Sequence, residues 1–259
     1  MSLEAGVFLI DKPAGPTSFR MVQRVRRLLK IKKVGHTGTL DPFASGLLIV
    51  CAGRPATRLT PQLMAGDKLY EATLRLGVET DTQDLEGQVI SERPAPALDL
   101  AAAQSVLAGF LGERMQIPPA FSALKHQGRP LYQYARQGVL IEKEARRVRI
   151  EELVATFVKG ERLGIRVRCG KGTYIRSLAA DIGRALGCGA HLIELRRLEN
   201  GPFSVAAAVS GHLLEGDEES ARAVLLAGGL TLDGLAAWMA AAPGFSPGCV
   251  DAGLPAMES

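Results

Sequence analysis

One acidic residue in the N-terminal third of the sequence stands where a side chain could do chemistry. Asp41 ends the loop KVGHTGTLD, between a basic helical pattern and an apolar run typical of a buried strand. Pro42 biases Asp41 toward an extended backbone, so we expect its carboxylate at the entry of the strand, exposed to a cleft. There it could cap a turn, accept from a lysine, bind a metal ion or act as a nucleophile. No second acid lies nearby, which argues against the metal ion.

Other candidate residues stand further along the chain. In KGTYIR (171–176), Tyr174 could stack on a base or pack in the core. Arg176 could hold a carboxylate in a two-bonded fork or form a surface ion pair. KGT resembles the end of a phosphate-binding loop, but the glycine-rich part and a magnesium-binding acid are missing. His36 could contact a phosphate or a base, or be structural, and Tyr70 lies on the strand face opposite Leu69.

The elements that must position these side chains are strands mixed with helices, without regular alternation. This order predicts an α+β domain. Strands are predicted at 6–12, 46–53, 68–77 and 164–170. Helices are predicted at 18–30 with Thr17 or Ser18 as N-cap, at 98–111, and at 173–189 with Gly187 or Gly189 as C-cap. One further helix is expected near 223–228 or 232–242, and the last residues are expected to fray.

The charge is unevenly distributed along the chain. The net charge is +4, but residues 211–259 hold seven acidic residues and one basic residue, which leaves 30 basic and 20 acidic residues in the first 210. Such a surplus of positive charge is typical of a domain that binds nucleic acid, although many basic proteins bind none. In the first helix, Arg20, Arg24, Arg27 and Lys30 share the polar face with no acid among them. This face is either simply solvated or follows a phosphate backbone.

Composition excludes several classes of protein. The apolar fraction of 47% and charged fraction of 22% are those of a globular protein. The four cysteines are far apart and form no metal-ligand pattern, which argues against zinc and against a disulfide framework. No signal peptide is expected before the first strand, and no apolar run is long enough to span a bilayer. We therefore expect a cytoplasmic protein with no metal and no membrane association.

Taken together, six segments resemble the motifs of one family, both in their amino-acid sequences and in their order along the chain. KVGHTGTLDPFASGLL is similar to the catalytic motif of the TruB-type tRNA pseudouridine synthases. The family's other motifs are matched by FLIDKPAGPTS, DKLYEATLRLGVETDTQDLEG, IPPAFSALKHQGRPLYQYARQG, KGTYIRSLAADIG and GCGAHLIELRRLENGPF. The resemblance covers roughly residues 6–205, and agreement of six long motifs by chance is implausible.

The resemblance implies a fold and an activity. The fold would be the α+β pseudouridine synthase fold, a mixed, mostly antiparallel sheet flanked by helices and loops with a central catalytic cleft. The enzyme would be a cofactor-free isomerase that converts uridine-55 in the T-arm of tRNA to pseudouridine, with Asp41 as nucleophile on a flipped-out base. Tyr70 would stack on the uracil or handle a proton, and Arg176 would pair with Asp41. Further substrate or RNA contacts are implied for His36, Tyr174, Leu195, Lys33, Lys125, Arg129, Lys171 and Arg197.

The resemblance also implies a domain organisation, from which the chain departs at its end. A catalytic domain is expected over 1–210, with an RNA-gripping insertion at about 117–148. Members commonly carry a C-terminal PUA-type RNA-binding domain, whereas residues 211–259 are an acidic tail rich in Ala and Gly. We expect a monomer that binds tRNA. The alternatives are a tRNA-folding chaperone that uses the same basic surface, and an enzyme that only cleaves N-glycosidic bonds.

Overall fold

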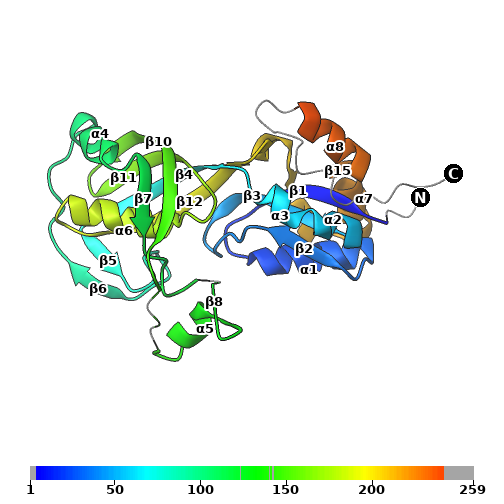
Figure 1. Cartoon of the computed structure of the whole chain (residues 1–259), viewed down its shortest axis with the longest axis horizontal. Coiled ribbons are helices and arrows are strands. Elements are labelled where there is room, and N and C mark those ends of the chain that lie inside the picture. Colours follow the sequence, from blue (N-terminus) through cyan, green and yellow to red (C-terminus); the bar gives the residue numbers. More distant parts are fainter. Residues whose placement is uncertain (1–3, 123, 140, 142, 242–259) are drawn as a thin grey trace. The chain divides into compact units, whose positions relative to one another are not determined.

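A computed structural model describes residues 4–122, 124–139, 141 and 143–241 of the chain, and Figure 1 labels the elements. The chain divides into two units by its contacts, one formed within Met1–Gly66 and Glu199–Ser259 and the other within Asp67–Leu198. Neither boundary tests the expected division at residue 210, which stays a prediction. In the described part of the chain, no helix has both the length and the apolar character needed to traverse a membrane.

The sheet of the first unit is built on β1 (Gly6–Lys12) and β3 (Ser45–Ala52), which pair antiparallel. Seven of the eight residues of β3 are buried, as its unbroken apolar run predicts. The stretch expected to be a loop begins with a short strand instead, since β2 (Val34–Thr37) pairs antiparallel with β3. Three more short strands complete the set: β13 (Phe203–Ser204), β14 (Val209–Ser210) and β15 (Gly229–Leu230).

The first helix, α1 (Ser18–Leu29), follows its sequence pattern closely. The hydroxyl of Thr17 accepts a hydrogen bond from the backbone N–H of Arg20 at 3.1 Å and so caps the helix. Its apolar side is buried and packs against β2 and β3. Lys30 ends the helix in the left-handed conformation, at φ 57°. Two short helices after β3 each carry a proline in the first turn: α2 (Arg54–Arg58) and α3 (Thr60–Leu63).

The C-terminal segment of the first unit contains two helices, where the sequence predicted one. These are α7 (Glu218–Ala227) and α8 (Leu232–Ala241), preceded by the 3₁₀ turns η1 (Val205–Ala207) and η2 (Leu213–Glu215). The prediction was wrong because the acidic composition hides an apolar face. Leu235 and Met239 are buried with Val7 and Leu9 of β1, and Trp238 lies 5.4 Å from Phe203 between ring centroids.

The second unit contains a longer antiparallel sheet. Its strands follow the order β12-β4-β11-β10-β7, and the pairs β4–β11, β11–β10 and β10–β7 are antiparallel. The strands are β4 (Lys68–Leu76), β7 (Gly112–Gln116), β10 (Arg146–Lys159), β11 (Arg162–Cys169) and β12 (Ala190–Asn200, whose last two residues belong to the first unit). The hairpin of β5 (Val78–Thr80) and β6 (Val89–Glu92) is separate.

Two helices of the second unit contact this sheet, α4 (Leu100–Ala108) at β10 and α6 (Ile175–Ala185) at β4. α4 is capped by Asp99, whose carboxylate accepts from the N–H of Ala102 at 2.7 Å. α6 is followed by Gly187 at φ 77°, so Gly187 and not Gly189 directly ends this helix. Within the expected insertion, the chain forms the hairpin β8 (Lys125–His126) and β9 (Arg129–Pro130), then α5 (Leu131–Ala135). Helices beside mostly antiparallel strands confirm the α+β class.

Candidate active site

Asp41 lies in a loop that is fixed on both sides of it. On the N-terminal side, the Ser18 hydroxyl both accepts from the N–H of Leu40 and donates to its carbonyl oxygen, each at 2.9 Å. On the C-terminal side, the carbonyl oxygen of Pro42 accepts from the N–H of Gly15 at 2.8 Å. Asp41 itself is half-buried, and its carbonyl oxygen accepts from the N–H of Ala44 at 3.1 Å. The loop is therefore held on both sides of Asp41, and Asp41 itself is not fully buried.

Lys12 provides a third attachment for this loop, which was not predicted from the sequence. Its side chain is fully buried, and the ammonium donates to the carbonyl oxygens of Pro13 and Pro16 at 2.8 Å and of Pro42 at 3.2 Å. A buried ammonium is stable only when its donors are satisfied. The only signal in DKPAGP was a lysine beside a proline-rich turn, since prolines offer carbonyl acceptors but no N–H donor.

His36 and Lys33 lie on the N-terminal side of this loop. His36 is half-buried on β2, where it pairs with Val50 of β3, and Lys33 is exposed just before the strand. The neighbouring Thr37 is fully buried and accepts from Asn200 at 3.4 Å between the side-chain atoms. The structure thus gives His36 a fixed backbone and leaves the predicted contact with the base or its neighbours untested.

In the second unit, Arg176 stands in the first turn of α6 with only 4% of its surface exposed. Its guanidinium forms an ion pair with Asp84 at 3.3 Å and donates to the carbonyl oxygens of Thr82 and Phe121, each at 2.8 Å. Asp84 in turn accepts from the Thr82 hydroxyl at 2.6 Å and from the N–H of Glu86 at 3.0 Å. The surface ion pair considered for Arg176 is wrong, because both members of this pair are buried.

Tyr174 begins the same helix, and Gln116 at the end of β7 fixes its backbone. The Gln116 side chain accepts from the N–H of Tyr174 at 2.8 Å and donates to its carbonyl oxygen at 3.0 Å. The guanidinium of Arg146 lies over the Tyr174 ring, 4.7 Å from its centroid. Tyr174 is half-buried. The alternative that this residue simply packs in the core is therefore wrong.

Tyr70 and Leu195 lie on strands β4 and β12, and each is 8% exposed. Tyr70 pairs with Val167 of β11. Although Leu69 and Tyr70 point to opposite faces, both faces of the strand are covered at this point. A base could therefore reach Tyr70 only if the residues that cover its face of the strand moved aside.

A group of cations gathers around Lys68 at the start of β4. Burial is the main cause that lowers the pKa of Lys68 from 10.5 to about 8, and the charges of Arg197 and Lys171 contribute to the same shift. Arg197 is almost fully buried and Lys171 is exposed. Two of the predicted RNA contacts thus lie near a third cation that the sequence analysis did not name.

The predicted contacts in the insertion are less defined. Arg129 is exposed in β9, whereas the side chain of Lys125 lies outside the described residues. Beside them, the Tyr134 hydroxyl donates to the His126 carbonyl oxygen at 3.2 Å. Nowhere in the described ranges do three or more His, Cys, Asp or Glu side chains form a group that could hold a metal ion.

The candidate residues therefore fall into both units. Asp41, His36 and Lys33 belong to the first, and the other candidates to the second. The pairing of Asp41 with Arg176, which the family resemblance implies, would join the two units and stays a prediction. Asp84 and Gln116, which hold Arg176 and Tyr174, were not predicted from the sequence. Only the acid-rich segment TDTQDLEG hinted at the first, and nothing indicated the second.

Comparison with known proteins gives consistent matches along the chain. Residues 26–175 match the family described as TruB family pseudouridylate synthase (N terminal domain), and residues 176–228 match the tRNA pseudouridylate synthase B C-terminal domain. The tRNA pseudouridine synthase B of Desulfotalea psychrophila is 57% identical over 211 residues, which is 80% of this chain and 86% of that protein. That of Chromohalobacter salexigens is 51% identical over 217 residues, 84% of this chain and 70% of that protein.

Solved structures agree with these matches. A Cbf5-Nop10-Gar1 complex contains a chain similar to this one with a TM-score of 0.65 and 32% identity, and an archaeal box H/ACA sRNP Nop10-Cbf5 complex gives 0.61 and 30%. Each match covers 86% of this chain but only 60% of the other. The pseudouridine synthase fold expected from the sequence is confirmed. The chain belongs to the TruB family of pseudouridylate synthases.

Proposed function

We propose that this chain isomerises uridine to pseudouridine at position 55 in the T-arm of tRNA, with Asp41 as the nucleophile. The observation that carries the proposal is the geometry of Asp41. The residues on both sides of it are fixed by Ser18, Gly15 and Lys12, while Asp41 itself is half-buried. A nucleophile needs this combination of a fixed position and access to the substrate.

The reaction breaks the N1–C1′ bond of uridine and forms a C5–C1′ bond. N1 gains a proton and C5 loses one, so the product is an isomer, and no oxidant, reductant or water is consumed. The carboxylate of Asp41 adds to C6 of the ring, attacks C1′ of the ribose or assists an elimination that breaks the N1–C1′ bond. On each route it must be ionised. Arg176 would favour the ionised form by its positive charge and orient the carboxylate.

The target base must leave its stack before Asp41 can reach it, at a cost of about a few kcal/mol. Contacts of basic side chains with phosphates would offset that cost. Lys33, Lys171 and Arg129 are exposed and suit this role. Tyr174 would border the flipped base, together with His36, Leu195 and Tyr70. Lys125 and Arg197 complete the proposed RNA contacts. The monomeric state and the cytoplasmic location stay predictions.

The test uses Asp41→Asn, which removes the nucleophile and nearly preserves its shape. A tRNA transcript with tritium at C5 of its uridines releases the label when pseudouridine forms, because the C5–H bond is broken. We expect the wild-type protein to release tritium at position 55 and the variant to bind the same transcript without release.

Two controls complete the experiment. Asp41→Ala excludes turnover by an asparagine that has deamidated to aspartate. Free uracil in the supernatant would indicate an enzyme that only cleaves the glycosidic bond. If Asp41→Ala released tritium at the wild-type rate, the nucleophile assignment would be wrong.

A further inference from the structure

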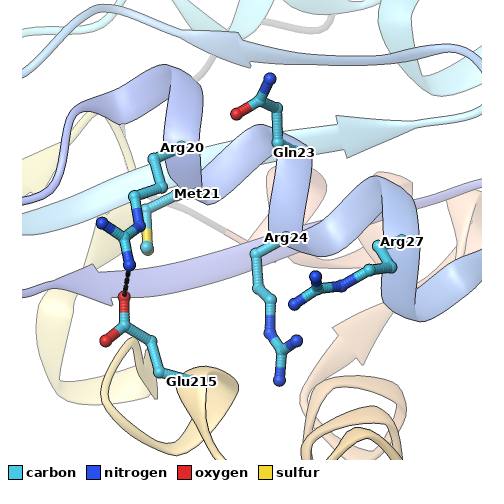
Figure 2. Close-up of a pocket in the computed structure, with 6 residues that line it drawn as sticks. All are labelled: Arg20, Met21, Gln23, Arg24, Arg27 and Glu215. Carbon is cyan, nitrogen blue, oxygen red and sulfur yellow. Dashed lines mark ion pairs between the residues drawn. The ribbon is translucent and has the colours of Figure 1, made fainter.

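A second basic site lies on α1, outside the loop that carries Asp41. A pocket of about 480 Å³ lies along this helix. Figure 2 shows the side chains that line this hollow. Six residues line it: Arg20, Met21, Gln23, Arg24, Arg27 and Glu215. All of them belong to the first unit, so the site is complete within one part of the chain.

The helical repeat produces this concentration of positive charge. Arg20, Gln23, Arg24 and Arg27 are spaced by three or four residues, so they share one face of the helix. The opposite face is buried against β2 and β3, which fixes the rotation of the helix and points the arginines outward. Three guanidinium groups and one carboxylate then line a single hollow, which suits a phosphate anion.

Arg24 connects the hollow to the C-terminal segment. Its Nε donates to the carbonyl oxygen of Leu214, and one terminal nitrogen donates to that of Gly216 at 2.6 Å. These bonds hold η2 against α1 and place Glu215, the residue between the two carbonyls, at the edge of the hollow. A guanidinium has five N–H donors, so Arg24 retains donors beyond the two that hold this turn.

Glu215 pairs weakly with the arginine beside it. The ion pair of Arg20 with Glu215 is 3.7 Å long, and the two side chains are 68% and 41% exposed. A pair so long and so open to water contributes little. Asp217 has a different task, because its carboxylate accepts from the N–H groups of Glu219 and Ser220 and caps α7. Glu215 is therefore the acid that a phosphate would have to displace.

We propose that this hollow binds a phosphate group of the RNA backbone, and that Glu215 competes with this phosphate for Arg20. The identity of the ligand as RNA rests on the proposed function. A phosphodiester can accept two parallel hydrogen bonds from one guanidinium, which the exposed carboxylate at 3.7 Å does not do. In the RNA-free protein Glu215 partly neutralises the arginines, and it moves aside when RNA binds.

Arg27 and Glu215 are the residues to test. Arg24 is unsuitable because its replacement would release η2. Arg27 makes no ion pair among the described residues, and its charge can be removed without breaking one. Arg26 is the matched control, since it is an exposed arginine of the same helix that does not line the hollow. Each change to glutamine removes one charge and keeps a polar side chain.

The measurement is the Kd for a full-length tRNA transcript over a range of salt concentrations. Arg27→Gln should raise Kd about 3–10-fold at low salt and reduce the salt slope by about one. For Arg26→Gln, the change in log Kd should be less than half of the change for Arg27→Gln. Glu215→Gln should lower Kd about 2–5-fold by removing the competing charge. This gain should disappear in the Arg20→Gln background, where the competition is already lost.

Several outcomes would overturn the proposal. If Arg26→Gln and Arg27→Gln weaken binding equally, the effect is one of net charge and no site exists at the hollow. An unchanged Kd for Glu215→Gln would contradict the competition. If titration with inorganic phosphate alone distinguishes the variants while tRNA binding does not, the ligand is a small anion and not RNA. Tritium release by the wild-type protein is measured in parallel, so a failure of this site is distinguished from a failure of the proposed function.

Discussion

The ammonium of Lys12 donates a hydrogen bond to the carbonyl oxygen of Pro42, at 3.2 Å between Nζ and O. Lys12 ends β1, and Pro42 directly follows the proposed nucleophile. The same ammonium also donates to the carbonyls of Pro13 and Pro16, so one buried side chain joins two proline-containing turns. The position of Asp41 thus depends on a lysine that has no part in the chemistry.

Replacement of Lys12 should lower both the stability of the protein and its turnover number. Lys12→Met keeps the length of the side chain but leaves the carbonyls of Pro13 and Pro16 without this donor. We expect the free energy of unfolding to fall by about 2 kcal/mol, partly offset because a buried charge is also removed. The turnover number should fall as the Pro42 turn loosens. Urea unfolding and tritium release measure the two effects, with the exposed Lys32→Met as control. Equal stability of the two variants would contradict the role of Lys12.

The buried pair of Arg176 and Asp84 makes a second prediction. Asp84→Asn removes a negative charge 3.3 Å from a guanidinium that is only 4% exposed. We expect a loss of about 2 kcal/mol in unfolding free energy, because hydrogen bonds to buried charged groups are the strong ones. The turnover number should fall as well, since Arg176 is proposed to orient Asp41.

Asp181→Asn on the same helix is the matched control for Asp84→Asn. Asp181 pairs with Arg184 at 2.6 Å, but the arginine is 63% exposed. Removal of an exposed pair costs about 0–1 kcal/mol. Burial also raises the pKa of Asp181, so its ionised form is less favourable in the folded protein than in the unfolded chain, and removal of this charge should not destabilise the fold. A loss in Asp181→Asn as large as that in Asp84→Asn would mean that burial of the pair is not what matters.

Local patterns in the sequence predicted β3, α1, β4 and α6, but not β2 and β12, which carry His36 and Leu195. The apolar run of β3 and the helical spacing in α1 are periodic signals, and Thr17 caps α1 as its residue type predicts. A periodic signal says which side of an element is buried only when the other side meets water. Tyr70 shows the limit, because alternation separated it from Leu69 while the structure buries both.

Contacts between distant segments could not be predicted from one sequence. Asp84 and Arg176 are separated by more than ninety residues, and the segment of Asp84 was interpreted as a polar connection. An isolated β-bridge joins Asp84 to Leu192, and no local pattern predicts this bridge. The presence of two C-terminal helices instead of one was not predicted, for a related reason. Their buried residues, such as Leu225 and Leu235, are few among exposed acids and alanines, so composition outweighed periodicity.

Gly183 in α6 gives a prediction in which packing opposes helix propensity. Alanine is a better helix former than glycine by about 1 kcal/mol. However, a Cβ at position 183 would lie 2.2 Å from the backbone nitrogen of Ala190 and 2.3 Å from the carbonyl carbon of Gly189. Neither backbone atom can move away cheaply. We expect Gly183→Ala to lower the unfolding free energy by about 1–3 kcal/mol.

Gly109→Ala is the control for Gly183→Ala in urea unfolding. Gly109 ends α4 at φ −68°, and the nearest atom to an added Cβ is a carbonyl oxygen at 3.4 Å. This change should be neutral or stabilise by about 0.5 kcal/mol through the unfolded chain. If Gly183→Ala were as stable as Gly109→Ala, the close approach of α6 to β12 would not constrain the helix.

Lys68 gives a prediction about pH. Burial, assisted by Arg197, lowers the pKa of Lys68 to about 8 in the folded protein, against 10.5 for an ordinary lysine. The unfolded chain therefore binds more protons than the folded one between pH 8 and 10.5. In this window the contribution of Lys68 to stability rises with pH, and below about pH 8 it is a constant penalty of at most about 3 kcal/mol.

Two buried thiols oppose this effect, so the prediction is a difference between two proteins. Burial raises the pKa of Cys51 to about 11 and that of Cys169 to about 12, and their contribution to stability falls as pH rises above 9. The variant Lys68→Met keeps both thiols, and it also removes the charge that lowers the pKa of Cys169. Its advantage over the wild-type protein in urea unfolding should be largest near pH 7 and shrink toward pH 10. An advantage that stays constant from pH 7 to 10 would show that Lys68 titrates alike in both states.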